Sequence, residues 1–277
     1  MKKLDAIDRR ARHVPRARRG SWPMRLVLVF VTLAFILVGR DAHAQAYRLE
    51  AQKDVPIVLV SAAVTSGFLF LDEVPARACV TDCDRSHVNP FDRWAAGRYS
   101  EGWARVGDVA TAATILFGPL VLVLDEGVRH GLNDSVVVAE AVLASSALQV
   151  AMSYAVPRAR PRVYGTEAPL ADRNDANAGR SFFSGHTADT VSSVVATTLT
   201  LHRLGRKRLG WLVLGAGVTG TALVGSARVL SGGHFPSDVL IGAMAGAGMG
   251  ILLPSLHGAP VTVAPMGSSG LVLNGTW

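Results

Sequence analysis

The chain has 277 residues, of which 49% are hydrophobic and only 18% are charged, and its mean hydropathy is +0.31. The apolar residues come in blocks, a composition typical of several buried or membrane-spanning helices. The formal net charge of +7 comes from residues 1–44 alone, and the remaining residues balance in charge, which excludes a nucleic-acid-binding surface.

The N-terminal segment has the layout of an export signal. A basic stretch ends at Arg25, an apolar run of 14 residues follows, and Ala-His-Ala at 42–44 fits the pattern before a cleavage point. The apolar run is shorter than the roughly 20 residues that a spanning helix needs. We therefore predict a cleaved signal peptide at 1–44, with an uncleaved membrane anchor as the alternative. Cys79 and Cys83 are compatible with a local disulfide in an exported chain, or with two free thiols.

Six further apolar blocks of 15–22 residues favour helices over strands by their length and composition. They are approximately Pro56–Leu71, Asp108–Leu124, Ser135–Val156, Thr187–Leu201, Trp211–Leu230 and Val239–Leu256. In the last block, glycines at 242, 246 and 250 repeat every four residues and predict close helix packing. We expect an all-α, membrane-embedded bundle of about six helices in residues 45–257, and a β-prone or irregular tail at 258–277.

The polar stretches between the blocks predict the orientation of the chain. The short loop His202–Gly210 carries four basic residues, which marks the cytoplasmic side. The stretches Glu73–Gly107, Arg158–Gly185 and Ser231–Asp238 then face the periplasm, which predicts an inner-membrane protein of the bacterial cell envelope. If every block spans the membrane, residues 56–71 have to enter it from the cytoplasm, whereas a cleaved signal peptide leaves the mature N-terminus in the periplasm. Either residues 56–71 therefore do not span, or the helices form a bundle attached to the membrane surface.

These periplasmic stretches contain residue types suited to the hydrolysis of a phosphate ester. Arginines match phosphate geometry, and a helix beginning at Ser184-Gly185 can hold an anion. Of two histidines, one can attack phosphorus and the other can protonate the leaving oxygen. We expect Asp238, four residues after His234, to hold the N–H of the attacking ring. This chemistry requires no metal, and we expect neither a metal site nor a cofactor.

The residues resemble the signature of the type 2 phosphatidic-acid phosphatase superfamily, which also includes bacterial acid phosphatases and vanadium haloperoxidases. That signature reads Lys-x6-Arg-Pro, then Pro-Ser-Gly-His, then Ser-Arg-x5-His-x3-Asp. The matching residues, over roughly Ser135–Leu256, are Arg160-Pro161, then Ser184-Gly185-His186 after Phe183, then Ser226, Arg228, His234 and Asp238. The chain departs from the signature mainly at Ser153, which stands at the lysine position.

The resemblance implies a role for each matching position. His234 would be the nucleophile that forms a phosphohistidine, His186 the general acid and Asp238 the orienting partner of His234. The phosphate would be held by Arg160, Arg228, Ser184 and Gly185. Since Ser153 carries no charge, we expect Arg158 or Arg162 to replace the missing lysine. Glu140, inside an apolar block, is expected to be interfacial.

We therefore predict a phosphatase that hydrolyses a lipid or isoprenoid phosphate or pyrophosphate through a phosphohistidine, without a metal, at one end of the bundle. Its partners would be that amphiphilic substrate and the membrane. The sequence does not rank phosphatidic acid, phosphatidylglycerol phosphate, undecaprenyl pyrophosphate and lipid A phosphates. The alternatives are a lipid phosphotransferase with the same intermediate, a haloperoxidase that holds vanadate, and a catalytically inactive membrane scaffold.

Overall fold

The computed structural model describes residues 46–67, 83–258, 262–266 and 270–274, all within one compact unit, Leu37–Trp277. The signal-peptide prediction for residues 1–44 lies outside the described residues, as does Cys79. Cys83 is disulfide-bonded.

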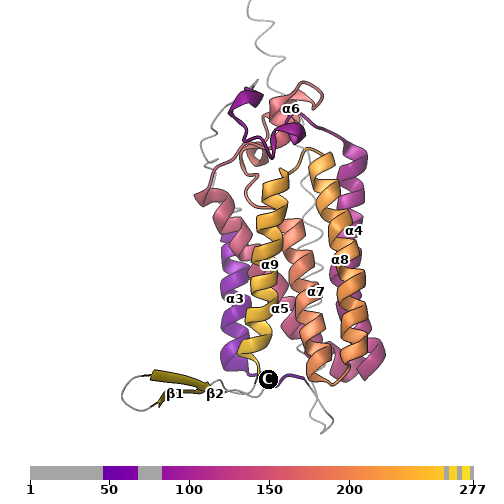
Figure 1. The fold of residues 1–277 in the computed structure, drawn as a ribbon, viewed down its shortest axis with the longest axis vertical. Helices are drawn as coiled ribbons and strands as arrows, with labels where there is room; N and C mark the ends of the chain where they lie inside the picture. The colour runs from indigo at the N-terminus through magenta and orange to yellow at the C-terminus, as the bar shows by residue number, and fades with distance from the viewer. Residues whose placement is uncertain (1–45, 68–82, 259–261, 267–269, 275–277) are drawn as a thin grey trace, which may run out of the picture. The chain divides into compact units, whose positions relative to one another are not determined.

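Among the described residues, six long helices form the bundle (Figure 1). They are α3 (Ala51–Gly67), α4 (Glu101–Glu126), α5 (Val128–Ala155), α7 (Gly185–Arg203), α8 (Lys207–Leu230) and α9 (Pro236–Leu256). Each of them overlaps one predicted block, so the all-α prediction is confirmed. The segments between them contain the short helix α6 (Leu170–Arg173) and 3-10 turns at Arg85–His87, Arg93–Ala95, Pro161–Tyr164 and Ala176–Gly179. In the tail, β1 (Thr262–Met266) and β2 (Gly270–Asn274) form an antiparallel hairpin in which Thr262 pairs with Asn274.

Within the described part of the chain, four helices are long and apolar enough to cross a membrane: α4, α5, α8 and α9. The helix α7 is not one of them, although it contacts all four. Its buried side chains include many hydroxyl groups, among them Thr187, Thr190, Ser192, Ser193, Thr197 and Thr200, each no more than 1% exposed. The helix therefore lies at the centre of the bundle, where its polar side chains are covered by its neighbours.

The glycine repeat of α9 packs directly against α7, as the sequence predicted. A Cβ atom added at Gly242 would lie 2.5 Å from the backbone oxygen of Ser184, and one at Gly250 would lie 2.8 Å from that of Ser192. Side chains at these positions would separate the two helices, so the repeat allows their backbones to approach closely. This contact also joins the start of α9 to the start of α7, where the Ser184 N–H donates to the Asp238 carbonyl at 3.0 Å.

Candidate active site

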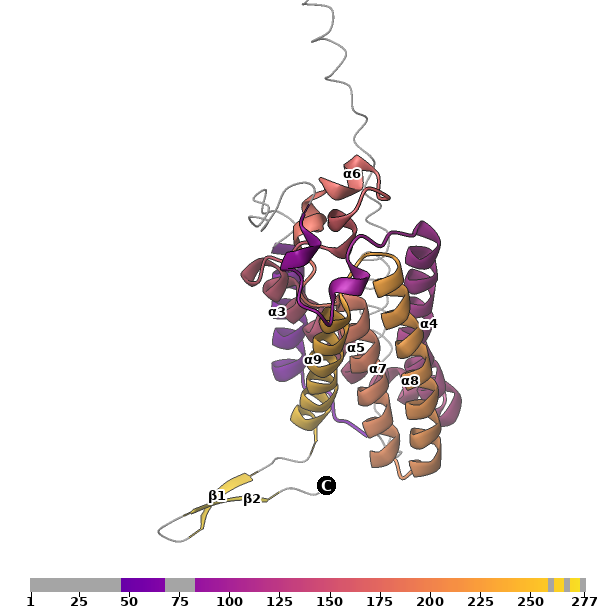
Figure 2. The ribbon, with the colours of Figure 1, turned by 45° about the horizontal axis from the view of Figure 1, so that its top comes forward.

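The residues predicted to carry the chemistry lie at one end of the bundle, the end that also carries α6 (Figure 2). His186 lies in the first turn of α7, Arg228 in the last turn of α8, and Arg160 in the segment after α5. His234 lies in the short connection between α8 and α9. The order of the helices thus brings segments that are distant in the sequence to a common location.

His234 is buried, with 3% of its surface exposed, and its ring has a defined orientation. Its Nδ1 lies 2.7 Å from the carbonyl oxygen of Ser181. Because a carbonyl oxygen can only accept a hydrogen bond, Nδ1 carries the proton and the neutral ring keeps its lone pair on Nε2. This is the form of the imidazole that a nucleophile needs.

Asp238 does not hold that ring directly, contrary to the expectation from the sequence. Its Oδ2 accepts hydrogen bonds from Ser181 Oγ at 2.6 Å and from the Phe235 N–H at 2.9 Å, and its Oδ1 pairs with Arg158. The bond to the Phe235 N–H also caps the start of α9. Ser181 therefore connects the two residues, since its hydroxyl donates to Asp238 and its carbonyl accepts from His234.

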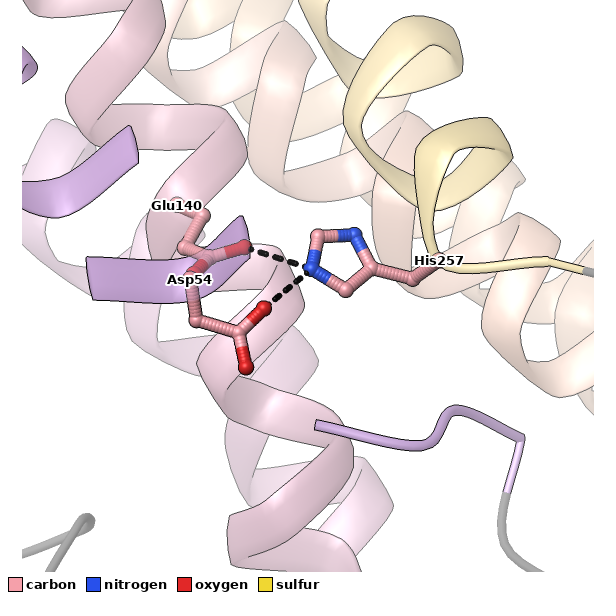
Figure 3. Close-up of side chains that lie close together, drawn as sticks. All are labelled: Asp54, Glu140 and His257. Atoms are coloured by element: carbon pink, nitrogen blue, oxygen red, sulfur yellow. Dashed lines mark hydrogen bonds and ion pairs between the residues drawn. The ribbon is translucent and has the colours of Figure 1, made fainter. Parts of the chain in front are cut away.

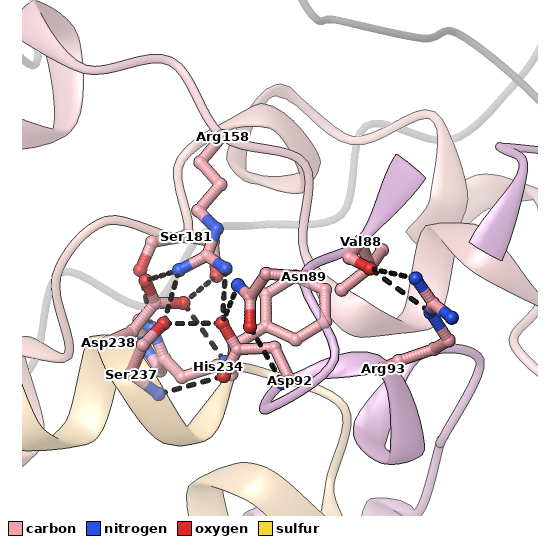
Figure 4. A network of polar contacts seen from close by, with 10 residues as sticks. Val88, Asn89, Asp92, Arg93, Arg158, Ser181, His234, Ser237 and Asp238 are labelled. Atoms are coloured by element: carbon pink, nitrogen blue, oxygen red, sulfur yellow. Dashed lines mark hydrogen bonds and ion pairs between the residues drawn. The ribbon is translucent and has the colours of Figure 1, made fainter. Parts of the chain in front are cut away.

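Arg158 joins two fully buried carboxylates (Figure 4). Its Nη2 lies 2.7 Å from Asp92 Oδ2, and its Nη1 pairs with Asp238 and donates to Ser237 Oγ at 2.8 Å. Its guanidinium also covers the ring of Phe235, 4.4 Å from the centroid. These contacts engage both Nη atoms with buried acceptors, which favours a structural role for Arg158 over the expected binding of phosphate. Asp92 is held in turn by the backbone N–H of Ser237 at 2.9 Å.

The position of the missing lysine brings no charge to the site. Ser153 is 4% exposed and its hydroxyl donates to the carbonyl of Val150 at 2.8 Å. Arg162, the second expected replacement, donates from Nε to the carbonyl of Asp172 at 3.1 Å.

Arg180 is a cation of this region that the sequence analysis missed. Its Nη1 donates to the hydroxyl of Tyr154 at 2.7 Å, one residue after the lysine position. Arg160 and Arg180 both donate to Asn177, Arg160 to its carbonyl at 2.8 Å and Arg180 to its side-chain oxygen. Burial and the neighbouring arginine charges lower the pKa of Arg160 to about 9. A group of arginines bonded to uncharged oxygen atoms attracts an anion.

Ser184 and Gly185 form the start of α7, as the sequence predicted. The Ser184 hydroxyl bonds with that of Thr187 at 2.9 Å. Gly185 is close to the side chain of Gln149, which a Cβ atom would approach to 3.1 Å. The N–H groups of a first helical turn have no acceptor within the helix, and the helix dipole is positive there. This helix start is therefore suited to bind the oxygen atoms of a phosphate.

Asp108 of α4 connects the predicted general acid to Arg228. Its Oδ1 lies 3.3 Å from His186 Nε2 and 2.7 Å from Arg228 Nη2. Arg228 also donates to the carbonyl of Ala104 at 2.7 Å, and its buried Nε has no hydrogen-bond partner among the described residues. At Gly107 a Cβ atom would overlap the guanidinium, so glycine makes room for it. The arrangement places a carboxylate that stabilises imidazolium beside His186, and it leaves donors of Arg228, including its Nε–H, for a ligand.

The environment of His234 predicts a pH profile. Burial, and then the positive charge of Arg160, lower the pKa of His234 well below its ordinary value of about 6.5. A lowered pKa keeps the nucleophile neutral as the pH falls, so we expect the acidic limb of kcat/KM to lie below about pH 6.5. Arg160→Gln removes one of the charges and should move this limb to higher pH, although the substrate titrates as before. If the acidic limb lies at the same pH in the original protein and in Arg160→Gln, it does not report the titration of His234.

Residues 135–260 match the model of the PAP2 superfamily. The predicted resemblance is confirmed over this region. The PAP2 region contains every predicted site residue, whereas Asp92 and Asp108 precede it. The match supports a phosphatase.

The chain is similar to a solved structure, that of "the first transmembrane PAP2 type phosphatidylglycerolphosphate phosphatase from Bacillus subtilis". The two chains are 19% identical with a TM-score of 0.39, and the alignment covers 84% of this chain and 94% of the other. No curated protein matches the chain.

Proposed function

We propose that this protein is a membrane phosphatase that removes phosphate from a lipid or isoprenoid phosphate through a phosphohistidine on His234. The observation that carries the proposal is the buried ring of His234, whose Nδ1 proton is held by the carbonyl of Ser181, so that Nε2 keeps the lone pair needed for attack. Arg160 and Arg228 supply the positive charge that the transferring phosphoryl group needs. His186, beside Asp108, protonates the leaving oxygen. The reaction is expected to need no metal at this site.

An apolar groove supports an amphiphilic substrate. A cavity of about 630 Å³ lies between α7, α8 and α9, and its lining includes Val191, Val218 and Leu240. At the end near the site the lining includes Thr187, in the turn after His186, and Pro236, two residues after His234. The helices α8 and α9 make few contacts with each other, which leaves this groove open on the side that faces lipid in a membrane. An acyl or isoprenoid chain in the groove would place its phosphate at the histidines.

The groove predicts a difference between long and short substrates. Ala222 is exposed and lines the groove, so Ala222→Trp would fill it. We expect kcat/KM for phosphatidic acid, phosphatidylglycerol phosphate and undecaprenyl pyrophosphate in detergent micelles to fall about 10-fold or more, which is the scale of losing a hydrophobic contact. The rate with p-nitrophenyl phosphate, which has no chain, should stay within about twofold of the original.

Ala216→Trp is the matched control, because Ala216 is also exposed on α8 but does not line the groove. This variant should leave kcat/KM unchanged for the long-chain substrates and for p-nitrophenyl phosphate. Equal losses on long and short substrates in Ala222→Trp would show damage to the site itself and would remove the groove from the proposal.

We also propose that Arg180 replaces the family's lysine. Its guanidinium lies beside Tyr154, the residue that follows Ser153, and shares Asn177 with Arg160. Arg180→Met should lower kcat/KM by about 10- to 100-fold, the equivalent of one charge-assisted hydrogen bond, with little change in Tm.

Ser153→Lys in the Arg180→Met background tests this replacement directly, because it restores a cation at the position that the family uses. Recovery of kcat/KM in the double variant, together with unchanged activity in Arg105→Met on the exposed surface of α4, would support the role. An active Arg180→Met protein would exclude it.

A further inference from the structure

Figure 3 shows a buried group of three ionisable side chains. It lies near the end of α9 that is opposite the phosphatase site. It consists of Asp54 on α3, Glu140 on α5 and His257, which directly follows α9. Their ligand atoms all lie within 4.8 Å of one another. His234 precedes the 21 residues of α9 and His257 follows them, so about 30 Å of helix separates the two sites.

The three side chains are closed off from solvent. The side chains of Asp54, Glu140 and His257 are 0%, 1% and 1% exposed. The sequence analysis expected Glu140 to be interfacial, and this was wrong, because α3 and the end of α9 cover it. His257 Nε2 lies 2.7 Å from Asp54 Oδ1 and 3.1 Å from Glu140 Oε2.

The tautomer of His257 directs Nε2 at the carboxylates. Its Nδ1 lies 2.8 Å from the carbonyl oxygen of Leu253, which only accepts, so Nδ1 carries a proton. This is the contact by which a metal-binding histidine is usually oriented from its second nitrogen. Nε2 is then the atom that faces both acids.

Hydrogen bonding alone leaves this cluster incompletely satisfied. If Nε2 is protonated, its single N–H bonds to Asp54 Oδ1 and leaves Glu140 without a donor, and the buried group keeps a net charge of −1. Asp54 Oδ2 and both carboxylate oxygens of Glu140 have no hydrogen-bond partner within the described part of the chain. An anionic oxygen that is buried without a donor is costly, and this cluster contains such oxygens on both of its carboxylates.

We propose that Asp54, Glu140 and His257 bind one divalent transition-metal ion, of the Zn²⁺ or Mn²⁺ class, that joins α3, α5 and α9. Two carboxylates and a neutral imidazole carry a charge of −2, which a divalent ion cancels. One nitrogen with carboxylate oxygens suits these ions, whereas Mg²⁺ and Ca²⁺ prefer oxygen ligands alone. Two ligand atoms that each lie about 2.0–2.2 Å from the same ion are somewhat over 3 Å from each other. The distances from His257 Nε2 to the two carboxylates therefore have to increase by about half an ångström when the ion binds.

The test uses the full-length protein in detergent, purified through an affinity tag without histidines and desalted. Metal content by mass spectrometry should be about one ion per chain. A chelator should lower Tm, and Zn²⁺ or Mn²⁺ should restore it. In Glu140→Gln and Asp54→Asn, the Kd for the ion, measured by competition with a chromogenic chelator, should rise about 100-fold or more.

Two variants keep the result specific to this cluster. Glu126→Gln makes the same chemical change on α4 outside the cluster, and His234→Ala removes the nucleophile at the other site; both should keep the full metal content. The proposal would be overturned if wild-type protein held no stoichiometric ion and its Tm did not rise when Zn²⁺ or Mn²⁺ was added. So would Glu140→Gln protein that binds as tightly as wild type. None of these readouts depends on phosphatase activity.

Discussion

Replacing His234 with alanine is expected to reduce phosphate release by about 10³-fold or more, because the proposed covalent route through Nε2 would be lost. The side chain is buried and makes its defined hydrogen bond to Ser181, so the variant also creates a cavity. Circular dichroism and Tm would show whether the bundle remains folded. His234→Gln, which fills most of the space without a nucleophilic nitrogen, should be equally inactive.

The proposed phosphohistidine can be tested directly. Wild-type protein that is quenched during turnover of a ³²P-labelled substrate should carry acid-labile, alkali-stable label, as a phosphohistidine does, and His234→Gln should carry none. His186→Ala separates the two histidines, because p-nitrophenol leaves without a proton and its ester should be hydrolysed far better than a lipid phosphate. Label on His234→Gln would mean that another residue is the nucleophile. Folded wild-type protein without turnover would favour the scaffold alternative.

Replacing Arg158 with methionine is expected to lower the free energy of unfolding by about 3–5 kcal/mol, the cost of removing one partner from a buried ion pair. The variant leaves Asp92 and Asp238, both 0% exposed, without their shared cation. Asp92 holds the N-terminus of α9 through Ser237, and Asp238 holds Ser181, so activity should fall as well. Denaturation in mixed micelles would measure the loss.

Arg105→Met is the matched control for this change. Its side chain is 81% exposed and forms one ion pair with Glu101 at 3.4 Å. A surface pair of this kind contributes about 0–1 kcal/mol, so Tm should hardly change. If Arg158→Met instead keeps its stability and raises KM alone, Arg158 binds phosphate, as the sequence analysis expected.

The sequence was sufficient to predict the helices and the histidines of the candidate site. Blocks of apolar residues identify helices because burial in a bundle or a membrane needs a continuous apolar length. Spacing within one segment also predicted that His234 and Asp238 lie near each other. It could not show that Ser181, from a separate segment 53 residues earlier, provides the carbonyl that holds the ring.

The remaining differences have the same cause. Arg158 and Arg180 both lie in the long polar segment before α7, and only the fold decides which of them meets two buried carboxylates. Asp108 could have been suspected, because a charge near the end of an apolar helix is costly unless it has a function. The interfacial prediction for Glu140 failed because the residue was counted by its depth along one helix. Its neighbours on α3 and at the end of α9 are distant in the sequence.

The hydroxyl-rich surface of α7 has a consequence for how the protein is assembled. A helix that is not apolar enough to cross a bilayer by itself gains little from entering lipid before its neighbours are present. The helices α8 and α9, which cover it, are synthesised after it. Stable integration of α7 therefore has to wait for them, and a nascent chain that stops before α8 should leave α7 exposed to translocation or to quality-control proteases.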